Sequence, residues 1–298
     1  MSNKIEIETL NIGIKNGRND AVCINIPDDA TTALVSTKNK YAAAPVILNK
    51  INITKNNPKY LFINSGNANA CTGKTGMRNT IECTMLLAKK LNCQKEKILM
   101  FSTGIIGRQL PMKLISKKII NHSFKFNSSW ISASKSIMTT DAFNKYLNKT
   151  IMLGKKKISI KGMCKGAGMI EPNMATMLAF ISIDLHLNKT LLSQLLKKAV
   201  DSSFNCISVD GDMSTNDSVA IIATGENKDL NLKNKPQMLS KIENELIQFC
   251  QSLAKMIVKD GEGATKIITI TIHQASKKSD AKRICYAIAN SNLFKTAM

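Results

Sequence analysis

Histidine and arginine are both scarce in this sequence of 298 residues. The only histidines, His122, His186 and His273, lie outside the loops that carry most of the clustered polar residues. A hydrolase of the Ser-His-Asp type therefore lacks a histidine in position to act as its base. Only four of the 42 basic residues are arginine, which is the side chain best suited to bidentate phosphate recognition. These shortages argue against a histidine-dependent hydrolase and against nucleic-acid recognition.

Metal-binding and disulfide patterns are missing as well, although eight cysteines are present. None forms a C-x-x-C pair, and none has a nearby histidine at the spacing of zinc ligands. A chain of this length buries a large core without covalent cross-links. We therefore expect reduced, mostly buried thiols and no bound metal.

Long apolar runs and nucleotide signatures are also absent. No window reaches 18 apolar residues, and the N-terminus has the pattern of neither a secretory signal nor a transit peptide. The segment 162–168 does not complete G-x-G-x-x-G, and G-x-x-x-x-G-K-[ST] does not occur. The formal charge of +21 is diffuse, and the excess of lysine, asparagine and isoleucine fits an AT-rich genome. We expect a soluble, cytosolic protein with no cofactor, no nucleic-acid partner and no membrane partner.

The spacing of apolar residues predicts a mixed α and β fold, in one large domain or two closely packed ones. Strands are expected at 21–26, 60–64, 97–102, 177–183, 219–224 and 266–273, with a further strand at 284–289. Helices are expected where apolar residues recur every three or four positions, at 77–88, 191–199 and 239–257. The charged stretch 144–161 is interpreted as a surface loop or a junction between lobes.

Five loops combine glycine with serine, threonine, asparagine and aspartate next to expected strands or helices, where functional loops are commonly held. They are NSGNANACTGKTG at 64–76, STGIIGRQLPM at 102–112, KGAGMIEPNMATML at 165–178, VDGDMSTNDS at 209–218 and DGEGATK at 260–266. Any one of them alone could be an ordinary turn. Together they are candidate site loops.

The five loops, together with MTTD at 138–141, resemble the ornithine acetyltransferase family of arginine biosynthesis, also called glutamate N-acetyltransferase. The motifs occur in the family's order and at similar separations over residues 12–297. The resemblance implies an α/β fold with sheets sandwiched by helices, and a self-processing chain whose nucleophile is an N-terminal threonine. Such a threonine needs no histidine, because its own α-amine, with a pKa of about 8, accepts the hydroxyl proton.

The family is processed within its A-T-M-L tetrapeptide, which corresponds here to Ala175 and Thr176. Attack of the Thr176 hydroxyl on the Ala175 carbonyl, followed by hydrolysis of the ester, would give an α chain of residues 1–175 and a β chain of residues 176–298. The resemblance implies a heterotetramer of two α and two β chains. It also implies a ping-pong reaction in which Thr176 carries an acetyl group from N-acetylornithine to glutamate.

The resemblance further assigns an oxyanion hole to Thr103 and Gly104. The implied substrate contacts are Thr139, Lys165, Thr176 and Glu262. Lys165 is expected to pair with a substrate carboxylate, and Glu262 with an ammonium group of an ornithine-like ligand. Polar residues in the same loops are interpreted as structural or supporting residues without an assigned role, namely Asn64, Asp210 and Asp212.

The resemblance breaks at the C-terminus, since family members usually continue well beyond the equivalent of Ala297. The missing part is expected to add strands and to complete the substrate pocket. The chain is then a shortened active enzyme, the product of a decaying gene, or a protein whose remainder comes from another polypeptide. Two other functions stay open, an N-terminal-nucleophile aminopeptidase and an inactive remnant or partner-binding protein. The use of acetyl-CoA as a second acetyl donor also stays open.

Overall fold

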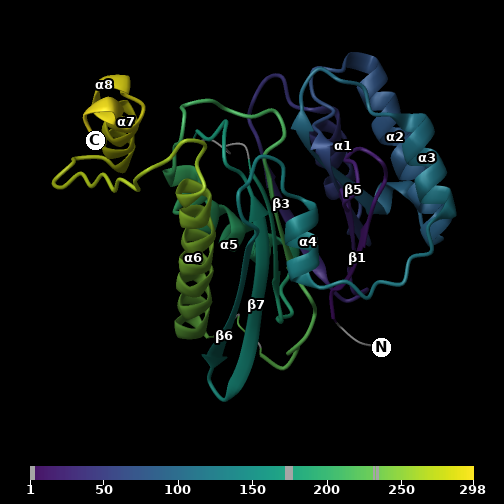
Figure 1. Cartoon of the computed structure of the whole chain (residues 1–298). Helices are drawn as coiled ribbons and strands as arrows, with labels where there is room; N and C mark the ends of the chain where they lie inside the picture. Colours follow the sequence, from purple (N-terminus) through teal and green to yellow (C-terminus); the bar gives the residue numbers. More distant parts are fainter. Residues whose placement is uncertain (1–3, 172–176, 231, 233–234) are drawn as a thin grey trace.

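The computed structural model describes residues 4–171, 177–230, 232 and 235–298, and its strands within these ranges form two sheets (Figure 1). The first sheet has four strands in the order β1-β2-β4-β5, and the second has five in the order β3-β9-β8-β7-β6. The strands are β1 Glu6–Leu10, β2 Ala21–Asn25, β3 Thr31–Ser36, β4 Tyr60–Asn67, β5 Ile98–Ile105, β6 Lys145–Leu153, β7 Lys156–Lys165, β8 Leu178–Ile183 and β9 Ser218–Ala223.

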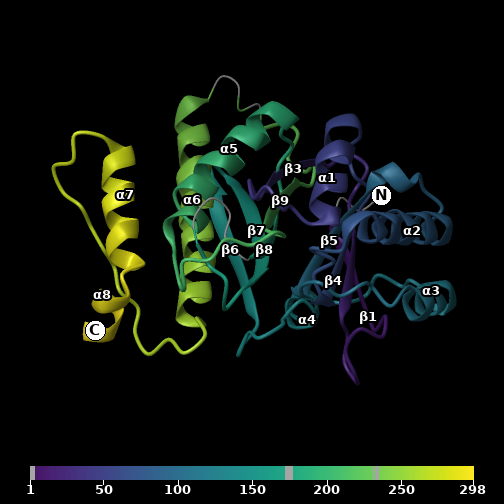
Figure 2. The same ribbon diagram turned by 90° about the horizontal axis from the view of Figure 1, so that it is seen from above.

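Helices cover the outer faces of both sheets. Figures 1 and 2 show α2 and α3 outside the first sheet, and α5 and α6 outside the second. The two parallel strand pairs, β4 with β5 and β8 with β9, are joined through α2 and α5 respectively. The helices are α1 Ala44–Lys55, α2 Gly73–Leu91, α3 Met112–Asn121, α4 Trp130–Ser136, α5 Lys189–Asp201, α6 Pro236–Lys259, α7 Lys278–Ala289 and α8 Asn292–Ala297. The prediction of sheets sandwiched by helices is therefore confirmed.

Apolar layers hold this arrangement together. Between the sheets, Phe101 of β5 meets Phe180 of β8 edge to face, with ring centroids 5.0 Å apart. Leu87 belongs to the apolar cluster beneath α2 and α3, and Phe249 to the one beneath α5 and α6. Because both faces of each sheet are covered, the central strands are apolar almost throughout, as all six buried residues of β8 illustrate.

The expected helices all form, within α2, α5 and α6. Asn188 begins α5 by accepting a hydrogen bond from the Leu191 amide at 2.9 Å. Asn92 ends α2 in the left-handed region with φ 51°. Five of the expected strands also form, as β2, β4, β5, β8 and β9.

The interpretation of 144–161 as a surface loop was wrong, because this stretch forms the hairpin of β6 and β7. The two strands meet at a two-residue turn in which Gly154 has φ 63°. Ile151 and Leu153 of β6, with Ile158 and Ile160 of β7, are buried in the core beneath α5 and α6. The lysines between them obscured the alternation of a strand that is polar on one side.

The expected strands at 266–273 and 284–289 were also wrong. Residues 266–273 are not assigned to a strand, and no strand pairs with them within the described part of the chain. Ile267 and Ile268 are accordingly 54% and 41% exposed. Residues 284–289 lie in α7, which Figure 1 shows on the far side of α6 from the sheets. A segment with the alternating pattern of a strand forms one only where a neighbouring strand can hydrogen-bond to its backbone.

None of the described helices is long and apolar enough to cross a membrane. All eight cysteines are free thiols, as expected. Four of them are buried, namely Cys23, Cys83, Cys164 and Cys250, whereas Cys71 and Cys206 are exposed. The expectation of mostly buried thiols is thus met by half of them.

Candidate functional site

The parallel strands β4 and β5 end side by side and carry the expected oxyanion residues. Ser65 lies in register with Thr103, and Gly66 with Gly104. Gly104 has φ 129°, and a Cβ at this position would lie 2.3 Å from the carbonyl carbon of Gly66. Only glycine fits such a close backbone approach. Thr103 is buried, with 5% of its surface exposed.

Asn216 ties this strand edge to the second sheet. Its side-chain amide donates to the carbonyl oxygens of Ala68 at 2.7 Å and Ser102 at 2.8 Å. These bonds hold the loop before β9 against the ends of β4 and β5. The sequence placed Asn216 in the 209–218 loop but gave it no role, since nothing local distinguishes a bridging asparagine from one in a turn.

A buried ion cluster joins the MTTD segment to β7 and to the end of α6. Lys145 Nζ lies 2.7 Å from Asp141 Oδ1 and 2.5 Å from Asp260 Oδ2. Asp141 also accepts hydrogen bonds from the Thr139 amide at 2.9 Å and from the Gly166 amide at 2.8 Å. Asp141 is therefore the common anchor of two segments that carry expected substrate contacts.

Lys165 ends β7 beside the same carboxylate. Its Nζ lies 3.7 Å from Asp141 Oδ2, and the residue is only 3% exposed. Burial lowers the pKa of Lys165, and the negative charge of Asp141 opposes that effect. Burial acts to raise the pKa of Asp141, but the charges of Lys165 and Lys145 outweigh it and lower that pKa from 3.8 to about 2. Lys165 is thus a buried amine whose charged form is favoured by the neighbouring Asp141 carboxylate.

Glu262 is placed against the loop that begins at Lys165. The Glu262 amide donates to the Ala167 carbonyl at 2.9 Å. A Cβ added to Gly168 would come within 2.8 Å of the Glu262 carboxyl carbon. Glu262 itself is exposed. The structure therefore brings the expected anionic contact next to the loop of the expected cationic one.

The predicted cleavage site, Ala175 and Thr176, lies outside the described residues. The chain on either side is held by two aspartates of the 209–218 loop. Asp210 accepts hydrogen bonds from the amides of Met169 and Ile170, at 2.5 Å and 2.7 Å. Asp217 accepts one from the Met177 amide at 3.0 Å. This confirms a structural role for Asp210, which the sequence had left unassigned.

Asp217 is a buried carboxyl that sequence reasoning missed. It is fully buried, and its Oδ2 has no hydrogen-bond partner among the described residues. Burial raises the pKa of Asp217 well above its ordinary value, while its bond from the Met177 amide and the charge of Lys165 oppose the shift. Asp217 ends the VDGDMSTNDS motif, but only the fold shows that it meets Met177.

Lys15 is a second residue that the sequence gave no reason to single out. Its ammonium donates to Ser65 Oγ at 2.5 Å and to the Met138 carbonyl oxygen. It therefore bridges the end of β4 and the residue just before Thr139. Burial and the nearby Arg18 lower the pKa of Lys15 to about 8.

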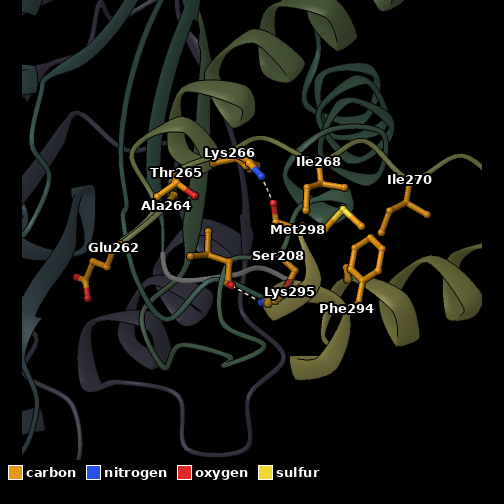
Figure 3. Close-up of a pocket in the computed structure, with 14 residues that line it drawn as sticks. Ser208, Glu262, Ala264, Thr265, Lys266, Ile268, Ile270, Phe294, Lys295 and Met298 are labelled. Atoms are coloured by element: carbon orange, nitrogen blue, oxygen red, sulfur yellow. Dashed lines mark hydrogen bonds between the residues drawn. The ribbon is translucent and has the colours of Figure 1, made fainter.

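A pocket of about 280 Å³ lies next to Glu262 (Figure 3). It is formed largely by the C-terminal segment, including Ile268, Phe294 and Met298. Figure 3 shows Glu262 at its edge, with its carboxylate away from Phe294. Of the predicted site residues that the structure describes, only Glu262 lines this pocket. The pocket is therefore not where the predicted site residues gather.

Hydrogen bonds, an ion pair and strand pairing connect the remaining predicted residues that the structure describes into one polar region. Thr139 and Lys165 share Asp141, and Lys15 links the residue before Thr139 to the strand edge of Thr103. The region offers ammonium groups, a glycine-lined backbone edge and, nearby, the exposed carboxylate of Glu262. This set can bind an amino acid and stabilise an oxyanion. No group of three or more metal-ligating side chains occurs among the described residues.

The model of the ArgJ family matches residues 6–298. The mitochondrial arginine biosynthesis bifunctional protein ArgJ of Dictyostelium discoideum is 43% identical over 289 residues, which cover 95% of this chain and 65% of that protein. The arginine biosynthesis bifunctional protein ArgJ of Geobacter sulfurreducens is 43% identical over 284 residues, which cover 95% of this chain and 72% of that protein. The chain thus spans less than two thirds of the length of the Dictyostelium relative and more than two thirds of the length of the Geobacter relative.

A solved structure agrees with these sequence matches. The crystal structure of ArgJ from Bacillus halodurans superposes with a TM-score of 0.52 at 30% identity, over 57% of this chain and 91% of that one. The family match covers all six motifs, whose segments meet in the polar region described above. The chain belongs to the ArgJ family.

Proposed function

We propose that the protein transfers an acetyl group from N-acetylornithine to glutamate, through an acetyl ester of Thr176. The nucleophile becomes available when the chain cleaves itself between Ala175 and Thr176. The observation that carries this proposal is the meeting of the family's motifs in one polar region. Thr139 and Lys165 share the Asp141 carboxylate there, and Asp217 binds the amide of Met177, which directly follows Thr176.

The chemistry follows from the groups at hand. The hydroxyl of Thr176 attacks the acetyl carbonyl of N-acetylornithine, and the freed α-amine of the same residue takes the hydroxyl proton. That proton passes to the leaving amine of ornithine. The amine of glutamate then attacks the acetyl ester, which releases N-acetylglutamate and restores the hydroxyl. Each attack forms an oxyanion, for which we assign donors at Thr103 and Gly104.

Self-cleavage is tested on a denaturing gel. Purified wild-type protein should separate into fragments of residues 1–175 and 176–298. The Thr176→Ala variant lacks the attacking hydroxyl and should remain one band near 32.7 kDa. A wild-type protein that stays intact, like the variant, would overturn self-processing at this position.

Acetyl transfer is tested by incubating the cleaved protein with N-acetylornithine, with and without glutamate. Ornithine should be released in amounts that match the N-acetylglutamate formed, and only when glutamate is present. Release without glutamate would instead identify a hydrolase of the N-terminal-nucleophile aminopeptidase type. Acetyl-CoA in place of N-acetylornithine tests whether a second donor is used.

The two chains are proposed to remain together as two α and two β chains. The contacts between the 1–175 and 176–298 segments support a stable pair, since β7 pairs with β8 and Asn216 binds Ser102. Light scattering on the cleaved protein measures the mass. A species with one α and one β chain would contradict the heterotetramer but not the pairing.

A further inference from the structure

Lys15 carries a half-buried ammonium that has no carboxylate partner within the described parts of the chain. Two of its hydrogens are taken by Ser65 Oγ and the Met138 carbonyl oxygen. An ammonium has three donors, so one remains to be used. A charged group that is partly withdrawn from water in this way gains from binding an anion.

The Lys15 backbone is firmly placed. The buried Asp20 carboxylate accepts hydrogen bonds from the amides of Ile12, Ile14 and Lys15, between 2.6 and 2.8 Å. These bonds occupy Asp20 and fix the loop that presents the lysine. The Lys15 side chain also lies against Gly66, where an added Cβ would come within 3.2 Å of it. The ammonium is therefore held beside the strand edge of the proposed oxyanion hole.

The carboxylates near Lys15 are already engaged with other groups. Lys145 is paired with both Asp141 and Asp260, and Lys165 has only a share of Asp141. Near Lys15, the Asp20 carboxylate is bound to backbone amides, and Asp141 is bound to Lys145. One carboxylate of an amino-acid substrate would pair with Lys165. A second carboxylate would be needed to satisfy Lys15.

The two substrates of the proposed reaction differ in this respect. Ornithine has a cationic side chain, for which Glu262 is the expected partner, whereas glutamate has an anionic one. We propose that Lys15 binds the side-chain carboxylate of glutamate and so selects the acetyl acceptor. This assignment rests on the proposed transfer reaction and names the part of the site that tells its two substrates apart.

The lowered pKa of Lys15 makes its proposed role testable by pH. Burial lowers its pKa to about 8, helped by the charges of Arg18 and Lys165 and opposed by Asp20 and Asp141. Near neutral pH the ammonium is charged when glutamate arrives. The preference for glutamate over glutamine should therefore decline as the pH rises through about 8.

The test compares glutamate with glutamine as acetyl acceptors, because glutamine has nearly the same shape but no side-chain charge. In Lys15→Met, kcat/KM for glutamate should fall by about tenfold or more, while kcat/KM for N-acetylornithine changes little. The preference for glutamate over glutamine should nearly disappear. Lys15→Gln can still donate a hydrogen bond but lacks the charge, and it should behave like Lys15→Met.

Lys90→Met serves as the matched control, since Lys90 also donates to a backbone carbonyl, that of Ile120 at 2.8 Å, but is exposed on α2. It should leave both substrates unaffected. If the Lys15 variants lose activity with both substrates equally and keep the preference for glutamate, Lys15 is only a structural tether and the assignment is wrong. A wild-type protein that transfers no acetyl group would overturn the proposed function itself, and this assignment with it.

Discussion

Replacing Asp141 with asparagine should strongly destabilise the fold. Asp141 lies 2.7 Å from Lys145 Nζ and 3.7 Å from Lys165 Nζ, and all three side chains are at most 4% exposed. Removing one member of a buried ion pair typically costs about 3–5 kcal/mol, because the other charge is left uncompensated. The asparagine amide would also face amides that now donate to the carboxylate, those of Thr139 and Gly166. The loss is a large part of a typical free energy of unfolding of about 5–15 kcal/mol.

The effect should depend on pH in a defined direction. The pKa of Asp141 is lowered in the folded state from 3.8 to about 2. Its carboxylate therefore stabilises the fold above about pH 4, by about 2 kcal/mol for the shift alone, and this contribution is lost as the pH falls through about 2. At neutral pH the Asp141→Asn variant should lose more stability than the pKa shift alone accounts for, because Lys145 and Lys165 stay charged without their carboxylate partner. The difference in the free energy of unfolding between wild type and variant should be constant from pH 7 to about 4 and should become smaller below about pH 4.

Urea unfolding measures the difference. The Thr176→Ala background keeps the chain uncleaved, so that unfolding is followed for a single polypeptide. Asp229→Asn is the control, since Asp229 forms an ion pair with Lys156 at the surface, and its loss should hardly change the free energy of unfolding. A cost below about 1 kcal/mol for Asp141→Asn at pH 7, the range of surface pairs, would refute the reasoning.

Two further changes probe the edge where the sheets meet. Gly104→Ala forces a Cβ to within 2.3 Å of the Gly66 carbonyl carbon, so it should abolish acetyl transfer; transfer at the wild-type rate would show that the backbone approach is not needed. Asn216→Ala leaves the carbonyls of Ala68 and Ser102 without their donor and should cost about 1–3 kcal/mol for a buried group left unpaired, measured by urea unfolding. An unchanged midpoint would contradict the bridging role.

The spacing of apolar residues correctly predicted the helices with one continuous buried face and the strands that are buried on both faces. The helices α2, α5 and α6 each have one buried stripe, and β8 and β9 are buried on both faces, so their apolar patterns are visible in the sequence. The hairpin of β6 and β7 was missed because charged side chains interrupt its buried positions. Residues 266–273 show the opposite error, since they alternate like a strand but have no described neighbour to pair with.

The candidate site likewise contains residues that the sequence motifs predicted and residues that only the fold revealed. The sequence motifs predicted site roles for five described residues, and the structure shows their segments in contact. They are Thr103, Gly104, Thr139, Lys165 and Glu262. Asp141 lay within one of these motifs and Lys145 follows it by four residues, yet Asp260, the third member of the ion cluster, comes from the distant end of α6. Lys15 had no signal at all, because a single lysine in a chain with 42 basic residues is indistinguishable from the others.

The sequence by itself determined the family, the order of the site loops, the principal helices and the strands buried on both faces, because these depend on local residue types and spacing. Only the tertiary structure decided which charges meet. Lys15 is more than a hundred residues from Lys145 and Lys165, and Asp141 and Asp260 are also separated by more than a hundred residues. The fold buries them together, and burial makes their pairing costly to break. The placement of the Lys15 ammonium between Ser65 and Met138 is a property of that arrangement.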